Sequence, residues 1–323
     1  MRTPKPLILL ATLLAWAAQH SAAVSQPYPA QDIHFISAFP PGSGSDTVMR
    51  FLAEKMRPLV SVPILVENKP GAGGVIAAEY VARSKPGGYT IFTHAGNTMA
   101  SVKHLLKNPP FDPATAIQVA ATINKQTFFI VVDAKKPWRS LGDLTAAMKA
   151  KGDKATYGAS ANIGLIMGAL YRELAGLNAI DVQYKSAPDA VNEMIGGAID
   201  FAVVDPILAI AQANAGRVRI LGVGSKERLQ SAPELPTLIE QGVPVEILSW
   251  FAALVPSATP KPVVATINGL FNKVLAMDET RAFLNKFGTE PWLSTPEEGQ
   301  AQMMKDLQIW PEYIRLAKLP LQG

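Results

Sequence analysis

A loop rich in glycine and serine separates the first strand-like run of the chain from the first helical one. The stretch reads FISAFPPGSGSDTVMRFLAEKM, and the loop lies between Pro40 and Asp46. Its small residues expose backbone N–H groups, Ser43 and Ser45 add hydroxyl donors, and the following helix brings a partial positive charge at its N-terminus. Two interpretations follow. The loop is either a tight turn in which Asp46 is the cap or a first-turn residue of the helix, or a nest of main-chain donors for an anion.

Polar residues also stand at the ends of four later strand-like runs. Such a residue taken alone is more typical of a helix cap than of a ligand contact. Ligands of open α/β sheets bind at the carboxyl ends of the strands, so we expect these residues to line one cleft together. They are His94, Asn97 and Thr98 around the end of 89–95, Ser160 and Asn162 around the end of 155–160, Tyr184 and Lys185 at the end of 180–185, and Asp205 at the end of 199–205.

A second glycine-rich stretch, VENKPGAGG, covers residues 66–74. It is similar to a dinucleotide-binding or phosphate-binding loop, but Ile76 stands where the Rossmann spacing requires its third glycine. The Gly-Lys-Ser/Thr of a P-loop is also missing. We therefore interpret this stretch as a turn into a helix that packs closely on the sheet.

Composition excludes several classes of chemistry. The chain has 323 residues, no cysteine and four histidines, so a thiol nucleophile, a lipid-anchored cysteine and cysteine-ligated zinc are excluded. No HExxH spacing is present, and we predict neither a metal site nor a cofactor. The net charge of +4 comes without a block of Lys or Arg, which gives no support for nucleic acid as a partner. A mildly basic protein does suit an anionic ligand.

The first 23 residues have the layout of a secretory signal peptide. Two basic residues precede the apolar run Leu7–Ala18, and Ser21-Ala22-Ala23 offers a small-residue cleavage site. The apolar run is too short to span a membrane. We expect the leader 1–23 to be cleaved and the mature protein to be soluble in the periplasm.

Strand-like runs alternate with helical ones along the mature chain. This order, with nearly continuous apolar strands, predicts parallel sheets covered by helices on both faces. The length favours two domains. The strand-like runs are 33–39, 62–68, 89–95, 128–134, 155–160, 180–185, 199–205 and 217–223.

No low-complexity linker separates the two expected domains, which indicates that strands connect them. The candidate crossovers are 127–133 and 249–256. They predict one lobe from 31–132 plus 250–323 and a second lobe from 133–249. Two lobes that are connected by strand hinges close around a ligand.

Several motifs of the chain occur in the order that is typical of one protein family. They are AFPPGSGSD, VENKPGAGG, PGGYT, YGAS, YKS, IGGAIDF, AGRVRILGV and SWFAALVPSATP. Over essentially the whole mature chain the sequence resembles the Bug family of periplasmic solute-binding proteins, which serve tripartite tricarboxylate transporters. The resemblance implies a type II, Venus-flytrap fold of two α/β lobes with two crossover strands. It also implies carboxylate ligands held by the first loop, largely through main-chain groups and ordered water.

The chain departs from the family pattern at positions that are expected to line the cleft. Ser43 replaces a glycine, YGASANIG and QYKS replace the more usual loops, and the acid Asp205 is shifted by one place. The ligand is therefore not transferable from a relative.

These observations predict a non-enzymatic, monomeric receptor for a small carboxylate: a di- or tricarboxylate, an aromatic acid or an acidic amino acid. Its partners are the membrane components of a transporter or, alternatively, a sensor. The other alternative is an exported hydrolase that uses Ser160, His94 and Asp205, although no G-x-S-x-G elbow is present. The predicted ligand-binding residues are Phe39, Pro41, Gly42, Ser43, Gly44, Ser45, Asp46, His94, Asn97 and Thr98 on the first lobe, and Ser160, Asn162, Tyr184, Lys185 and Asp205 on the second.

Overall fold

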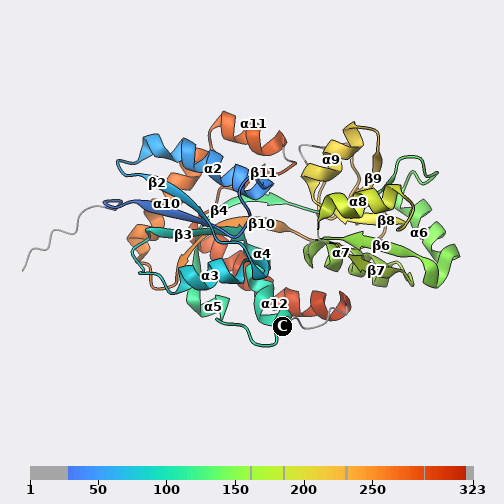
Figure 1. The fold of residues 1–323 in the computed structure, drawn as a ribbon, viewed down its shortest axis with the longest axis horizontal. Helices are drawn as coiled ribbons and strands as arrows, with labels where there is room; N and C mark the ends of the chain where they lie inside the picture. Colours follow the sequence, from blue (N-terminus) through green and yellow to red (C-terminus); the bar gives the residue numbers. More distant parts are fainter. Residues whose placement is uncertain (1–27, 161, 185, 230–231, 287, 318–323) are drawn as a thin grey trace, which may run out of the picture.

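A computed structural model describes residues 28–160, 162–184, 186–229, 232–286 and 288–317. Two β-sheets, each flanked by helices, lie side by side (Figure 1). We call the six-stranded sheet with its helices the first lobe and the five-stranded sheet with its helices the second lobe. The predicted leader lies outside the described residues.

The first lobe is built from both ends of the described chain. Its N-terminal part contains β1 (Ile33–Ser37), α2 (Gly44–Met56), η1 (Arg57–Leu59), β2 (Ile64–Asn68), η2 (Ala72–Gly74), α3 (Val75–Ala82), β3 (Thr90–Ala95), α4 (Gly96–Leu105), α5 (Pro113–Ala116) and β4 (Ile117–Gln126). Its C-terminal part contains β10 (Ser249–Pro256), α10 (Lys261–Leu275), α11 (Asp278–Lys286), β11 (Glu290–Pro291) and α12 (Pro296–Ala317). The strand order is β11-β4-β10-β3-β1-β2.

The second lobe is formed by the middle of the chain. Its elements are β5 (Phe129–Asp133), α6 (Leu141–Lys151), η3 (Gly152–Lys154), β6 (Thr156–Ala159), α7 (Asn162–Leu174), β7 (Ile180–Gln183), α8 (Ala187–Ile195), β8 (Phe201–Val204), α9 (Pro206–Asn214) and β9 (Val218–Val223). The strand order is β7-β6-β8-β5-β9. All eight predicted strand-like runs contain a strand of the structure, whereas β4 and the two-residue β11 were not predicted.

The expectation of parallel sheets is confirmed for three strands of each sheet and wrong for the strands that pair with the crossings. Strands β1, β2 and β3 are parallel, as are β6, β7 and β8, but β10 is antiparallel to β3 and β4. In the second sheet β5 is antiparallel to β8 and β9. The cause is the crossing of the chain: β4 leads out of the first lobe and β10 leads back into it, so these neighbours run in opposite directions.

The two crossings of the chain are hydrogen-bonded to each other. Gln126 at the end of β4 pairs with Ser249 at the start of β10. Beyond this pair, the Thr127 hydroxyl donates to the Ile247 carbonyl at 3.0 Å. Gly224, just after β9, bridges the two crossings: its N–H donates to the Phe128 carbonyl at 3.0 Å, and its carbonyl accepts from the Ile247 N–H at 2.7 Å. The crossings therefore form one short ladder between the lobes.

The position of the ladder indicates where one lobe ends and the other begins. The predicted first lobe included residues 129–132, but these residues lie in β5, which pairs with β8 and β9 of the second sheet. We propose that the lobes divide at residues 127–128 and 247–249, a few residues before the predicted boundaries.

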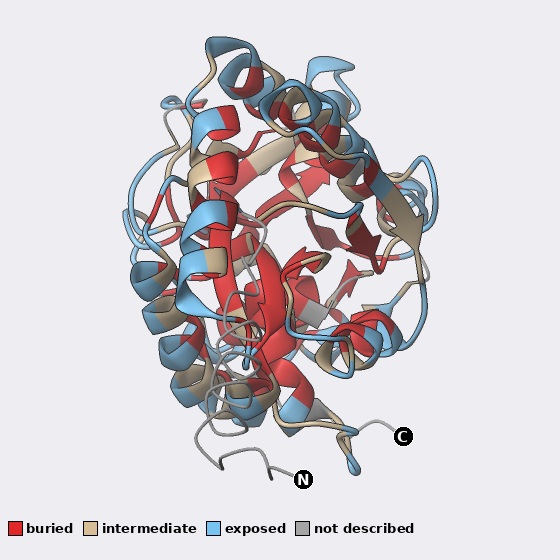
Figure 2. Ribbon diagram, turned by 90° about the vertical axis from the view of Figure 1, so that its left-hand side faces the viewer, coloured by how far each residue is buried: buried red, intermediate tan, exposed pale blue. Residues whose placement is uncertain are grey.

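Alternation along β1 explains how the first sheet is covered. Successive side chains of a strand point to opposite faces. Phe35 packs in a cluster with residues of α2 and α10, whereas Ile36 packs in a cluster with residues of α3, α4 and α12. Figure 2 shows the buried strands enclosed by helices whose outer faces are exposed.

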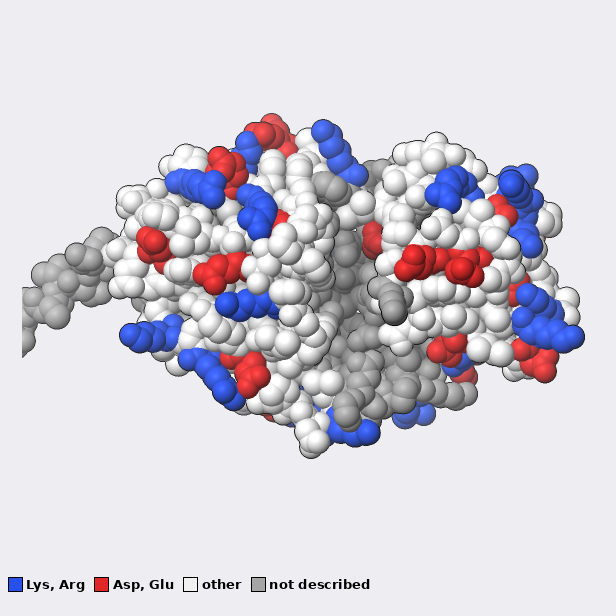
Figure 3. All heavy atoms as spheres, in the orientation of Figure 1, with Lys and Arg blue, Asp and Glu red and all other residues white. Residues whose placement is uncertain are grey.

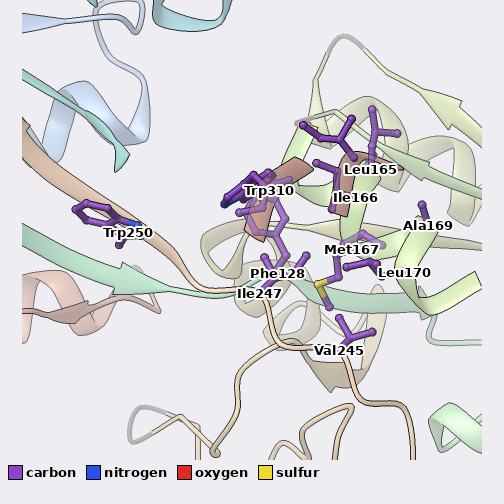
Figure 4. Packing of buried hydrophobic residues seen from close by; sticks show 14 of the residues in the cluster. Phe128, Leu165, Ile166, Met167, Ala169, Leu170, Val245, Ile247, Trp250 and Trp310 are labelled. Carbon is purple, nitrogen blue, oxygen red and sulfur yellow. The ribbon is translucent and has the colours of Figure 1, made fainter. Parts of the chain in front are cut away.

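Helix α12 contributes to the packing between the lobes. It contacts α4 and β4 of the first lobe and α7 of the second. Its Trp310 belongs to the same buried cluster as Phe128 and Ile247 of the two crossings and Met167 of α7 (Figure 4). The hydrophobic core thus continues from one lobe into the other at the hinge.

Trp250, on the second crossing, is fully buried and is held by a hydrogen bond as well as by packing. Its indole N–H donates to Asp306 Oδ2 at 2.7 Å, and Gln302 donates to Asp306 Oδ1 at 2.7 Å. A Cβ on Gly96 would lie 2.2 Å from the indole ring, so only glycine fits there. Burial raises the pKa of Asp306 to about 6, although both hydrogen bonds favour its ionised form.

Replacing Trp250 with Phe should therefore destabilise the protein in a pH-dependent way. The variant loses buried contacts and leaves the Asp306 carboxylate with one donor fewer, at a cost of about 2–3 kcal/mol at pH 7.5. Since the pKa of folded Asp306 lies above its ordinary value, ionisation opposes folding as the pH rises through 6. Without the indole N–H, ionisation of Asp306 opposes folding more strongly than in the unmodified protein. The stability that the variant loses should therefore be smaller at pH 5 than at pH 7.5. Urea unfolding of both proteins at the two pH values measures it, and equal deficits would contradict the account.

Candidate functional site

A cavity of about 740 Å³ lies between the lobes and is lined by residues of both. Figure 3 shows the face of the molecule on which the furrow between the lobes opens. Its walls are formed at the carboxyl ends of β1 and β3 in the first lobe and of β6 and β8 in the second, and the two crossings contribute Asn124, Gln126, Phe128 and Ser249. The cavity thus lies where open α/β sheets bind ligands.

The first loop enters α2 through a left-handed glycine and a serine cap. Gly42 has φ +80°, and Ser43 is the N-cap of α2, where its hydroxyl accepts from the Asp46 N–H at 3.3 Å. Gly44 is the first residue of the helix, and Asp46 lies in its first turn. Ser43 and Ser45 line the cavity. The helix N-terminus therefore faces the space between the lobes.

Asp46 shapes this loop from behind. It is 1% exposed, and its Oδ2 accepts from the Gly42 N–H at 2.8 Å and from Arg50 Nε at 2.9 Å. Asn68 at the end of β2 donates to Asp46 Oδ1 at 2.7 Å and to the Phe39 carbonyl at 2.9 Å. Burial opposes ionisation, but the hydrogen bonds from Arg50, Asn68 and Gly42 outweigh it and lower the pKa of Asp46. The carboxylate holds the loop in shape and does not line the cavity.

His94 forms part of the first-lobe wall as a neutral ring. It is 4% exposed, its Nε2 lies 3.2 Å from the Gly73 carbonyl, and its ring lies 5.1 Å from each of the rings of Phe39 and Phe92. Burial lowers the pKa of His94 to about 4. Because a carbonyl only accepts, Nε2 carries the proton, and Nδ1 is a buried acceptor without a partner among the described residues.

The second glycine-rich stretch also reaches the cavity. A Cβ on Gly74 would lie 2.5 Å from His94 Nε2, so the close packing predicted for this turn is present. Gly71, Gly73 and Gly74 line the cavity, which the interpretation as a turn alone had missed. Glycines carry no polar side chain, so the only sequence sign of their role was their small size.

The second lobe contributes a hydroxyl and a carboxylate. Ser160 follows β6 and lines the cavity. Asp205 also lines it and is the N-cap of α9, with Oδ1 accepting from the Leu208 N–H at 3.0 Å. Burial raises the pKa of Asp205 more than its backbone hydrogen bonds lower it.

The structure brings about half of the predicted site residues to the cavity wall. Those that line it are Phe39, Ser43, Ser45, His94, Thr98, Ser160 and Asp205. Those described elsewhere are the exposed Pro41 and Gly42, the buried Asp46 and Asn97, and Tyr184, whose ring lies against Gly158. Lys185 and the side chain of Asn162 lie outside what the structure describes, and Gly44 is placed only as the start of α2.

The hydrolase alternative finds no support in the contacts of its three residues. Ser160, His94 and Asp205 all line the cavity. However, the Nε2–H of His94 is directed to the Gly73 carbonyl, and Asp205 accepts from backbone N–H groups at the start of α9. The described residues also contain no group of three His, Asp or Glu side chains that could hold a metal ion.

The lobes touch across one side of the cavity. Gly288, just before β11, has φ +63°, and a Cβ on it would lie 2.8 Å from Pro206 Cβ and 2.8 Å from Ile210 Cδ1 of α9. Neighbouring Thr289 lines the cavity. This contact between the first lobe and the second closes one edge of the site.

Replacing His94 with Phe should remove a pH-dependent part of the stability. The pKa of His94 in the folded protein, about 4, lies below its ordinary value of 6.5, so folding favours the neutral ring. That contribution, on the order of 3 kcal/mol, is complete above pH 6.5 and is lost as the pH falls towards 4. Urea unfolding between pH 7.5 and 4.5 should show a shallower decline for the variant. Parallel declines would show that His94 is not buried in its neutral form.

Comparison with known families and relatives identifies the chain. The family model described as the tripartite tricarboxylate transporter family receptor matches residues 48–315. Protein BugT of Bordetella pertussis is 25% identical over 322 residues, which cover 98% of each chain. A UPF0065 protein of Bordetella bronchiseptica is 31% identical over 277 residues, which cover 84% of this chain and 81% of the relative.

Solved structures confirm the predicted two-lobed α/β periplasmic binding protein fold. The periplasmic binding protein BugD matches with a TM-score of 0.77 and 28% identity over 91% of this chain and 100% of BugD. An R. palustris protein solved with adipate matches with a TM-score of 0.80 over 90% of this chain and 98% of its own, and at 24% identity this likeness concerns the fold alone.

The matched family also confirms the prediction of a periplasmic binding protein rather than an enzyme, because its members are transport receptors. Within the described ranges, no helix has the length and hydropathy needed to cross a bilayer. The chain belongs to the family of tripartite tricarboxylate transporter receptors, which includes the Bug proteins.

Proposed function

We propose that this receptor captures a small carboxylate between its lobes and delivers it to the membrane components of a tripartite tricarboxylate transporter. The observation that supports this most is the cavity between the lobes, with the first loop and the N-terminus of α2 at its wall. Two Rhodopseudomonas palustris proteins of the same fold were solved with adipate and with malate, which are both carboxylates. Delivery would follow cleavage of the leader 1–23 and would be carried out by the monomer.

The chemistry of the wall favours binding through neutral hydrogen-bond donors. The hydroxyl-bearing residues Ser43, Ser45, Thr98 and Ser160 line the cavity, together with residues of the glycine-rich turns. No Lys or Arg lines it within the part of the chain that the structure describes. A carboxylate is stable in such a site because N–H groups at a helix N-terminus and the helix dipole compensate its charge.

A thermal-shift screen of mono-, di- and tricarboxylates tests the proposed function. A carboxylate present at 100 times its Kd should add about 2.7 kcal/mol to the free energy of unfolding. Mass spectrometry after overnight incubation should return the bound carboxylate chemically unchanged. If no carboxylate of the screen stabilises the protein, the proposal is wrong.

The main chain of the first loop should matter more for binding than any single hydroxyl of it. Gly42 has φ +80°, and a Cβ there would meet nothing within 4 Å, so Gly42→Val strains the backbone without a clash. A strain of about 2 kcal/mol corresponds to about a 30-fold loss of affinity. Ser45→Ala removes one hydroxyl from the wall and should cost less than about tenfold.

Calorimetry with the tightest carboxylate of the screen compares the two variants, and circular dichroism checks that both are folded. Equal or reversed losses would show that the loop acts through its hydroxyls and not through its main-chain shape.

The contact at Gly288 should be needed for full closure. A valine side chain there would meet Pro206 and Ile210 of the other lobe, so Gly288→Val should keep the lobes apart and weaken carboxylate binding at least tenfold. Gly176→Val is the matched control, because Gly176 has a similar φ of +64° but open space around its Cβ position. Small-angle scattering should show that ligand reduces the radius of gyration of the control and not that of Gly288→Val. The same compaction in both variants would rule out this contact as part of closure.

A further inference from the structure

Among the described residues that line the cavity, one is acidic and none is Lys or Arg. Asp205 is that acidic residue, and burial raises its pKa. His94 is uncharged near neutral pH, since burial lowers its pKa to about 4. The described wall offers no Lys or Arg to pair with the further carboxylates of a di- or tricarboxylate.

Asp205 itself has capacity left for a further donor. Its Oδ1 serves as the cap of α9 by accepting from the Leu208 N–H. No Lys, Arg or His among the described residues forms an ion pair with it. A carboxylate enclosed by two closing lobes without a cation is costly, and a cationic group of the cargo would remove that cost.

The rest of the wall is largely apolar on both sides. The first lobe contributes Phe39, Met49 and Phe251, and the second lobe contributes Ile163 and Ile207. A second carboxylate on the cargo would lose its hydration against these side chains or would lie near Asp205, a like charge. A carbon skeleton without charge, in contrast, gains from the same burial.

We infer that the cargo is a zwitterion with an apolar skeleton: its carboxylate binds at the first-lobe loop around Ser43 and Ser45, and its ammonium group binds Asp205 of the second lobe. The inference rests on the proposed function and narrows it from carboxylates in general to amino-carboxylates. It also makes Asp205 the residue that determines specificity, because its charge discriminates between an ammonium and a second carboxylate at the same place.

Matched probes test this directly. Linear ω-amino acids from 3-aminopropanoate to 8-aminooctanoate are compared with the dicarboxylates and the simple monocarboxylates of equal length. The aromatic set is 4-(aminomethyl)benzoate, terephthalate and 4-methylbenzoate. Calorimetry at pH 7.5, where the amines and carboxylates are ionised, should give the best amino-carboxylate at least a tenfold lower Kd than its matched dicarboxylate.

Asp205→Asn removes the charge and keeps the cap, because Asn and Asp are equally good N-cap residues. In this variant the preference for the amino-carboxylate over the matched dicarboxylate should fall at least tenfold. Asp112→Asn is the control, since the Asp112 side chain also caps a helix, α5, and lies away from the cavity wall. It should leave the preference unchanged.

The outcomes distinguish failure of the inference from failure of the proposed function. Tighter binding of a dicarboxylate than of its matched amino-carboxylate overturns the inference and leaves carboxylate capture standing. A preference that survives Asp205→Asn unchanged removes Asp205 as its cause and overturns the inference as well. Binding of no carboxylate in any set overturns the proposed function together with the inference.

Discussion

The hydrogen-bonded ladder between the two crossings of the chain is the constraint on which the rest of the structure depends. The pair of Gln126 and Ser249 and the bond from Thr127 to Ile247 join the outgoing and returning segments at the point where the chain changes sheets. The cavity is lined by residues of both lobes and by these crossings, so its width follows from the angle that the ladder allows. Packing of α12 against α4 and α7 supports the ladder from one side.

Some residues of the site fix its shape, and others face the ligand. Asp46 and Asn68 fix the first loop from behind, through bonds to the Gly42 N–H and the Phe39 carbonyl. His94 is held neutral by burial, with its ring against Phe39, which outweighs the opposing effect of the hydrogen bond to the Gly73 carbonyl. The donors left for a carboxylate are therefore main-chain N–H groups and hydroxyls, which can respond to shape as well as to charge.

Periodicity and strand ends predicted the fold well, because the apolar character of the eight runs indicates that they are buried strands. Strand β4 was missed and the antiparallel pairs of the sheets were not predicted, since the pairing of β4 with β10 depends on residues more than a hundred positions apart. Of the residues predicted from their place at strand ends, His94, Thr98, Ser160 and Asp205 line the cavity. Asp46 lies in the first turn of its helix as predicted, but it was also predicted to contact the ligand and does not line the cavity, because it bonds to Asn68, 22 residues away. Gly73 and Gly74 were missed because a glycine shows its role only through what approaches it.

A crystal structure with a bound carboxylate is the most direct test of the central claim, that the cavity between the lobes holds its ligand through the main chain of the first loop. The account predicts carboxylate oxygens within hydrogen-bond distance of backbone N–H groups between residues 42 and 45, and contacts to the same molecule from Ser160 or Asp205 of the second lobe. A carboxylate bound at full occupancy to one lobe only, or held by lysine or arginine side chains away from this loop, would contradict it.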